Sequence, residues 1–313
     1  NNGEKVIVQV KKKLEEGYIQ PKEVRIPGIL VDYVVVAENP ENHKQTLLVD
    51  YNPEYVTRKN EAPSVKEVAK LDERKIVARR CAMLLNRDQK ILNYGIGMPE
   101  MIANVLNEEQ QEEYFIPTVE PGAIGGTPEG GLNFGASIYP RATVDQPYQF
   151  DFYDGGGIDA AFLGLAQCDR NGNINVSKFG PKIAGCGGFI NITQNAKSVV
   201  FCGTFTAGGL DVEVKDGKLV INQDGKIKKF ISDVEQITFS GDVARQNNKK
   251  VIYVTERAVF ELTKDGVVLT EIAPGIDLEK HILNQMDFKP IISENLKLMD
   301  ERIFRDEKMG LVL

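Results

Sequence analysis

The chain has 313 residues, of which 42% are hydrophobic and 27% charged, a composition typical of a globular protein with a buried core. Its net charge of -7, with both signs scattered along the sequence, argues against nucleic acid as the main partner, because phosphate backbones require a basic surface. We find no run of 18 apolar residues and no secretory signal, so we expect no membrane span and a cytoplasmic location.

Histidine and cysteine are sparse, which limits the chemistry that the chain can perform. The two histidines are His43, in a polar turn, and His281, in an expected amphipathic helix over 277–286. We therefore expect no metal site and no triad built on histidine. The four cysteines form no CxxC pair and are typical of reduced, cytosolic thiols: Cys81, Cys168, Cys186 and Cys202. Catalysis is expected to rest on carboxylates and backbone dipoles.

The first part of the chain, residues 1–58, is predicted to be β-rich. Apolar runs predict strands over 5–10 and 29–37, with a candidate third strand over 46–51. A strand this close to the first residue needs neighbours for its backbone hydrogen bonds, so the opening resembles the middle of a longer protein. A polar connector over 59–64 indicates a domain boundary.

After the connector, helical and strand patterns alternate. Ser64 and Glu67 have the spacing of a capping box and predict a helix from there to about Leu85. A second helix is expected after Pro99. Apolar runs predict strands over 90–97, 114–120, 159–169 and 198–205. This alternation predicts the α/β class with an open, largely parallel sheet.

Beyond residue 210 the pattern changes to short alternating runs separated by Asp-Gly pairs. These pairs, which favour tight hairpin turns, begin at Asp216, Asp224 and Asp265. The carboxyl-terminal region is therefore predicted to be β-rich.

Three glycine-rich turns follow apolar strands, over 93–99, 120–126 and 184–188. Ligands of open α/β sheets bind beyond the carboxyl ends of strands, and glycine lets backbone N–H groups approach them closely. One such loop would be read as a simple turn, and the dinucleotide pattern GxGxxG is not met because Glu100 stands three residues after Gly97. Three loops, one of which carries Glu120 at a strand end, indicate a ligand site, although that carboxylate alone could be a cap or turn residue.

These motifs resemble a known family. TVEPGAIGG (118–126) is similar to the glutamate motif of family I CoA-transferases, above all their acetate/propionate group. NYGIGMP (93–99) resembles the oxyanion loop of that family, and AGCGGFINI (184–192) its later glycine-rich motif. The resemblance runs in family order over nearly the whole chain. It implies that 1–58 end an amino-terminal half-domain and that 59–313 form the catalytic CoA-transferase domain.

The resemblance implies a ping-pong reaction in which Glu120 attacks an acyl-CoA and carries CoA as a glutamyl thioester. It also implies an oxyanion and CoA site at Asn93, Gly95, Ile96, Gly97, Gly187 and Gly188, with Lys182, beside Lys178, as a candidate contact for a CoA phosphate. Coenzyme A would be substrate and covalent intermediate, with no permanently bound cofactor and no metal. The nearest rival carboxylate, Glu129, is interpreted as loop surface.

The same resemblance suggests substrates and partners. Relatives that use succinate carry a lysine about twenty residues after the glutamate. No lysine stands near 135–137 here, although Arg141 is close. Short monocarboxylates such as acetate, propionate or butyrate are therefore favoured as substrates. The amino-terminal half, as a separate or cleaved chain, is an expected partner, together with further copies in a homo-oligomer. Two alternatives stay open: an acyl-CoA hydrolase on the same scaffold, and a non-catalytic CoA-binding subunit.

Overall fold

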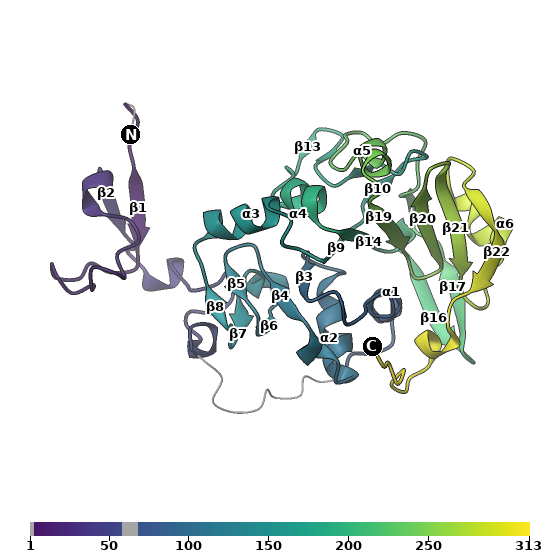
Figure 1. The fold of residues 1–313 in the computed structure, drawn as a ribbon, viewed down its shortest axis with the longest axis horizontal. Helices are drawn as coiled ribbons and strands as arrows, with labels where there is room; N and C mark the ends of the chain where they lie inside the picture. Colours follow the sequence, from purple (N-terminus) through teal and green to yellow (C-terminus); the bar gives the residue numbers. More distant parts are fainter. Residues whose placement is uncertain (1–2, 58–67) are drawn as a thin grey trace.

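A computed structural model describes residues 3–57 and 68–313, and its main feature is one ten-stranded sheet (Figure 1). The order of the strands is β22-β21-β20-β19-β14-β9-β3-β4-β5-β8. The five middle strands run parallel to one another. They are β19 (Lys250–Val254), β14 (Ser198–Cys202), β9 (Ala160–Gly164), β3 (Ile91–Tyr94) and β4 (Ile116–Thr118).

The two ends of this sheet contain antiparallel pairs. One end is built from β20 (Ala258–Thr263), β21 (Gly266–Ile272) and β22 (Ile291–Leu298), of which β22 runs parallel to β21; the other is built from β5 (Ala123–Ile124) and β8 (Ala142–Thr143). Beside the first end lies the hairpin of β16 (Asp211–Lys215) and β17 (Lys218–Gln223). Its turn residues, Asp216 and Gly217, have φ of 51° and 70°, as a tight Asp-Gly turn requires. The predicted α/β class and the β-rich carboxyl-terminal region are confirmed.

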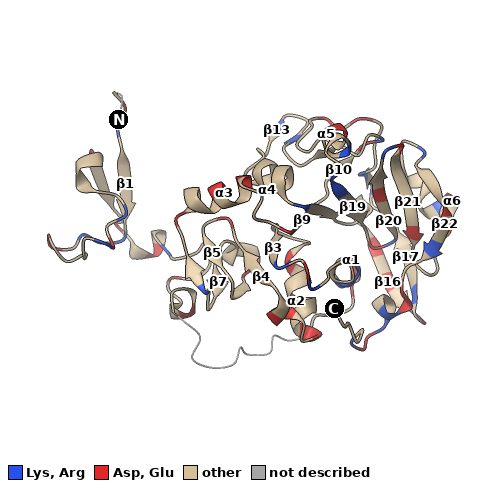
Figure 2. Cartoon of the chain, in the orientation of Figure 1, with Lys and Arg blue, Asp and Glu red and all other residues tan. Residues whose placement is uncertain are grey.

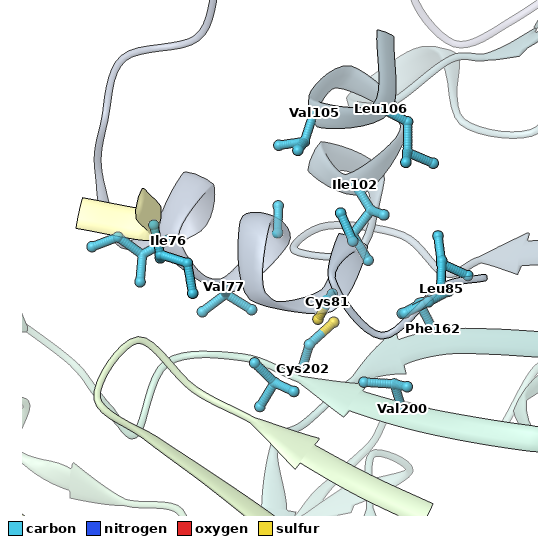
Figure 3. Packing of buried hydrophobic residues seen from close by; sticks show 14 of the residues in the cluster. Ile76, Val77, Cys81, Leu85, Ile102, Val105, Leu106, Phe162, Val200 and Cys202 are labelled. Carbon is cyan, nitrogen blue, oxygen red and sulfur yellow. The ribbon is translucent and has the colours of Figure 1, made fainter. Parts of the chain in front are cut away.

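Side chains alternate between the two faces of the sheet along each strand. Both faces carry apolar side chains, and helices cover both of them. On one face α1 (Glu73–Ala82) and α2 (Glu100–Glu108) pack on Val200 and Cys202 of β14, and Cys81 of α1 points toward Cys202 (Figure 3). On the other face α3 (Gln146–Asp154), α4 (Phe189–Asn195) and α5 (Gly241–Gln246) pack on Val199 and Phe201. The two hydrophobic cores fix the sheet edge that carries the site.

Short elements complete the fold. Two-residue strands are β6 (Thr127–Pro128), β7 (Ser137–Ile138), β10 (Gln167–Cys168), β11 (Ile174–Asn175), β12 (Lys178–Phe179), β13 (Lys182–Ile183), β15 (Thr206–Ala207) and β18 (Ile227–Lys228). Single 3-10 turns lie at Glu112–Tyr114, Gly131–Asn133 and Glu301–Phe304. Basic and acidic side chains are both scattered over the chain (Figure 2).

The first helix begins later than the sequence predicts. Ser64 and Glu67 lie outside the described residues, and residues 68–72 are not helical. Asp72 is the N-cap of α1, since its side chain accepts the backbone N–H of Lys75 at 2.9 Å. The Lys75 ammonium then donates to the carbonyl of Ala69, which holds the preceding segment in a non-helical path.

The amino-terminal segment is less β-rich than predicted. It contains β1 (Ile7–Val10) and β2 (Tyr33–Val36), a parallel pair that stands apart from the large sheet in Figure 1. The predicted third strand over 46–51 is wrong, because the Thr46 hydroxyl accepts the N–H of Val49 and closes a turn instead. Single 3-10 turns occupy Gly28–Leu30, Pro40–Asn42 and Pro53–Tyr55.

The predicted amphipathic helix over 277–286 is also broken. It forms α6 (Leu278–His281) and then a 3-10 turn, Leu283–Gln285. The His281 side chain accepts the N–H of Asp277, so this histidine caps its own helix. Among the residues that the structure describes, no helix is long and apolar enough to cross a bilayer, and no three His, Cys, Asp or Glu side chains are grouped as a metal site would need.

Candidate active site

Glu120 lies directly after β4, at the carboxyl end of that strand, where the Thr118–Val119 run leaves the sheet. The residue is half-buried, but its Oε2 atom is removed from solvent and has no hydrogen-bond partner among the described residues. Burial raises the pKa of Glu120, and its backbone N–H and the Asn93 side chain, as hydrogen-bond donors, partly lower it. The carboxylate is therefore neither fully solvated nor neutralised by a cation.

Asn93 occupies the neighbouring strand β3 and is completely buried. β3 and β4 are parallel and paired at Asn93 and Thr118, so Asn93 and Glu120, which follows Thr118 by two residues, lie at the same end of the sheet. The Asn93 Nδ2 atom donates to the carbonyl of Thr118 at 3.2 Å. Asn93 thus links the two strands at the base of the glutamate.

The loop after β3 presents a free backbone donor at Ile96. The N–H of Gly95 donates to the carbonyl of Phe162 at 2.8 Å, and a Cβ at Gly95 would lie 2.8 Å from a Leu163 methyl group, so a larger residue is excluded. The N–H of Gly97 donates to Glu100 at 2.8 Å and is not available. The N–H of Ile96 has no partner among the described residues. Of these loop residues, Ile96 is the one placed to donate to a ligand.

The later glycine-rich loop reaches the glutamate from the other side. Gly188 begins α4, and a Cβ at this position would lie 3.5 Å from Cγ of Glu120 and 2.9 Å from the ring of Phe150. Gly187 has φ of 51°, in the left-handed region that favours glycine. Neither N–H has a partner within the described part of the chain. Three loops that are distant in sequence therefore meet at Glu120.

Other predicted residues lie elsewhere. Lys182 and Lys178 are exposed on the β12–β13 hairpin, and no contact between described residues joins them to Glu120. Glu129 is not loop surface as predicted: it is half-buried and hydrogen-bonded to the hydroxyl of Tyr55. The stem of Arg141 packs over Gly125.

Two site residues, Gln149 and Tyr153 of α3, escaped the sequence analysis. Gln149 Nε2 donates to the Tyr153 hydroxyl at 2.9 Å and to the carbonyl of Val119, next to Glu120, at 3.3 Å. Burial, with a smaller contribution from Glu120, raises the pKa of Tyr153 to about 12. Their spacing of four residues, which places them on one helix face, was the signal available in the sequence.

Buried acceptors without donors mark this cluster. Glu120 Oε2, Asn93 Oδ1 and Gln149 Oε1 are all buried and unpaired among the described residues. Buried polar atoms in folded proteins are almost always paired, so an unpaired group is expected where a ligand binds or chemistry occurs. A cavity of about 760 Å³ reaches Pro121, beside Glu120, and is walled by segment 41–47, which contains His43.

Comparisons with known proteins identify the family to which the chain belongs. No protein-family model matches it. The acetate CoA-transferase YdiF of Escherichia coli O157:H7 is 48% identical over 313 residues, which is 100% of this chain and 58% of YdiF. The solved structure of that acyl-CoA transferase, a thioester complex with CoA, matches with a TM-score of 0.84 at 45% identity, again over 100% and 58% of the two chains. This chain thus spans less than two thirds of YdiF.

Two further relatives differ in their named substrate and in their length. A caffeate CoA-transferase of Acetobacterium woodii is 47% identical over 316 residues, 99% of this chain and 60% of the relative. The acetate CoA-transferase subunit beta of Escherichia coli K12 is 31% identical over 221 residues, 66% of this chain and 89% of that subunit. With these matches and the shared fold, the chain belongs to the family I CoA-transferases.

Proposed function

We propose that this chain provides the catalytic carboxylate of a CoA-transferase, and that Glu120 carries CoA as a glutamyl thioester. The observation that supports this most is the position of Glu120 at a strand end, beside the buried Asn93 side chain and against Gly188, whose N–H is unpaired among the described residues. The thioester complex of YdiF with CoA supports the same chemistry by relationship. In this proposal residues 59–313 form the catalytic domain, and 1–58 end the half-domain before it.

The reaction begins when a Glu120 oxygen adds to the thioester carbon of an acyl-CoA. The C–S bond breaks, CoA leaves as a thiolate, and a mixed anhydride remains. The thiolate then adds to the glutamyl carbon and the donor acid leaves as a carboxylate. A second carboxylate reverses these steps and departs as the new acyl-CoA. Over the whole cycle one thioester is exchanged for another, so little driving force is required.

Each addition creates a tetrahedral oxyanion, and fixed N–H donors are the expected means of stabilising it. One such donor contributes about 10²–10³ in rate. The N–H groups of Ile96 and of Gly187–Gly188 are unpaired among the described residues, so they can donate without first breaking another hydrogen bond. The N–H of Gly97 is assigned a supporting role, since Glu100 already accepts it.

The nucleophile needs no general base, because a glutamate is ionised at neutral pH. Burial makes the charged form less stable and so favours its reaction, while hydrogen bonds from the Glu120 backbone and from Asn93 oppose the rise in its pKa. This balance explains how a chain with only two histidines can perform acyl transfer without a histidine base.

The proposed substrates are CoA esters and free acids of short monocarboxylates, with Lys182 as a candidate contact for a CoA phosphate. The relatives named for acetate and for caffeate show that close sequences accept acids of different size. The proposed partners are the amino-terminal half-domain, as a separate or cleaved chain, and further copies of the same protein.

An exchange assay tests the proposal. The chain is prepared together with the amino-terminal half-domain and mixed with acetyl-CoA and deuterated acetate, and labelled acetyl-CoA is measured by mass spectrometry. Label in the thioester is the expected result. Free CoA released at the same rate without any acid would indicate a hydrolase, and neither label nor free CoA would indicate a binding subunit.

A further inference from the structure

The buried face of α3 carries two polar side chains where a core helix normally carries apolar ones. Gln149 is 1% exposed and Tyr153 is 0% exposed, and they lie one turn apart on the same face. Their neighbours Tyr148 and Phe152 point outward, at 66% and 41% exposed. Burying an amide and a hydroxyl costs free energy unless both are well paired, and Gln149 Oε1 is unpaired among the described residues.

The hydrogen bonds of these two residues converge on the catalytic strands. The Tyr153 oxygen accepts Gln149 Nε2 at 2.9 Å and Asn93 Nδ2 in a longer contact of 3.5 Å. Gln149 Nε2 also donates to the carbonyl of Val119, the residue before Glu120. One hydroxyl therefore connects the helix to the Asn93 carboxamide on β3, while Gln149 connects it to the end of β4.

We infer that Tyr153 and Gln149 are positioning residues, which fix the orientation of the Asn93 carboxamide beside Glu120 during CoA transfer. This inference rests on the proposed function. Neither side chain is required to touch the substrate: Tyr153 acts through Asn93, and Gln149 acts through Tyr153 and through the backbone at Val119.

The geometry also explains why the position is not simply aromatic. The ring of Tyr153 packs against Phe150 with centroids 5.5 Å apart, and Phe150 in turn contacts Gly188. A phenylalanine at 153 would keep those ring contacts and lose the acceptor for two amide N–H groups. With that acceptor absent, the Asn93 amide keeps only its hydrogen bond to the carbonyl of Thr118, so its orientation is less restricted.

The charges around the cluster are few, so the effect on Glu120 has a clear sign. Glu120 acts on the pKa of Tyr153, and the groups that act on Glu120 are its own backbone and Asn93. The Asn93 donor lowers the pKa of Glu120. Loss of that donor raises the pKa further, so the ionised nucleophile would disappear at a higher pH than in the wild type.

The test measures the rate at which acetyl-CoA forms a CoA adduct, as a function of pH, on the chain prepared with its amino-terminal half-domain. Tyr153→Phe and Gln149→Met should slow adduct formation by about 10- to 100-fold. The acid limb of the profile should move to higher pH. Tyr148→Phe, which removes a hydroxyl from the exposed side of the same helix, is the matched control and should leave both unchanged.

A double variant separates positioning from a general packing defect. If Tyr153 acts through Asn93, Asn93→Ala combined with Tyr153→Phe should be no slower than Asn93→Ala alone. The inference would be overturned if the rate losses of Asn93→Ala and Tyr153→Phe multiplied in the double variant. It would also be overturned if Tyr153→Phe kept the wild-type rate and acid limb. No adduct in the wild type would instead refute the proposed function, so the two failures are distinguishable.

Discussion

Two glutamates whose carboxylates are shielded from solvent, one buried and one half-buried, lie close in sequence but in different environments. Glu109, at the end of α2, accepts the N–H of Met309 on one oxygen and that of Leu311 on the other, at 2.6 and 2.9 Å. Glu120, at the end of β4, leaves Oε2 unpaired among the described residues and has a raised pKa. The first carboxylate fixes the carboxyl-terminal tail to α2, whereas the second is left available.

The difference shows what distinguishes a structural from a reactive acid here. Both side chains are removed from bulk water, so burial alone does not decide. A carboxylate that accepts two strong hydrogen bonds is stabilised in its charged form and is a weak nucleophile. Incomplete pairing at Glu120 costs stability and favours reaction, which is the pattern expected of a catalytic group.

The largest effect is predicted for loss of the nucleophile. Glu120→Ala should reduce CoA transfer by at least about 10³-fold, because it removes the carboxylate that forms the thioester. The exchange of label between acetate and acetyl-CoA measures this. Glu129→Gln is the control, since Glu129 is engaged with Tyr55, and it should retain transfer. Equal losses in both variants would contradict the distinction between the two carboxylates.

A smaller effect is predicted for crowding the glutamate. In Gly188→Ala the new methyl group would lie 2.9 Å from the Phe150 ring and 3.5 Å from Cγ of Glu120, so the ring must shift within the site. Transfer should fall by about tenfold with little change in melting temperature. At Gly164, at the end of β9, an added Cβ meets nothing within 4 Å, and Gly164→Ala should be silent. A silent Gly188→Ala would place the loop away from the reacting carbonyl.

The smallest effect on transfer, and a clear effect on stability, is predicted at the other glutamate. Glu109→Gln retains one acceptor and loses the charge that holds two N–H groups, so the free energy of unfolding should fall by about 1–3 kcal/mol. Thermal melting measures the loss, and hydrogen exchange at Met309 and Leu311 should be faster. Turnover per folded molecule should not change. A reduced turnover without loss of stability would show that Glu109 contributes to the reaction.

The sequence predicted the parts of the site that depend on backbone conformation. Glycines at 95 and 188 mark close approaches, Gly187 has a left-handed φ, and apolar strands followed by such turns indicate a shared sheet edge. The parallel sheet itself follows from the alternation of helices and strands. Glu120 was found because its motif resembles a family, since a carboxylate before Pro-Gly has no unique meaning by itself.

What the sequence could not show depends partly on contacts between distant segments and partly on local side-chain hydrogen bonds that compete with regular structure. Gln149 and Tyr153 are polar residues in a helix. Nothing in their local sequence indicates that Tyr153 is hydrogen-bonded to Asn93, or Gln149 to the carbonyl of Val119. The start of α1 was misplaced because two capping signals compete, and the Asp72 cap with its Lys75 contacts defines the described start of the helix. The failed strand over 46–51 has the same cause, a side-chain turn formed by Thr46.

Whether Glu120 carries CoA is tested most directly by measuring the mass of the intact chain after acetyl-CoA is added without an acceptor acid. The protein is prepared with its amino-terminal half-domain, and the adduct is located by peptide mapping. The expected result is an increase of the chain's mass by that of CoA, which hydroxylamine removes and which maps to the peptide containing Glu120. An unmodified chain, or an adduct on another residue, would contradict it.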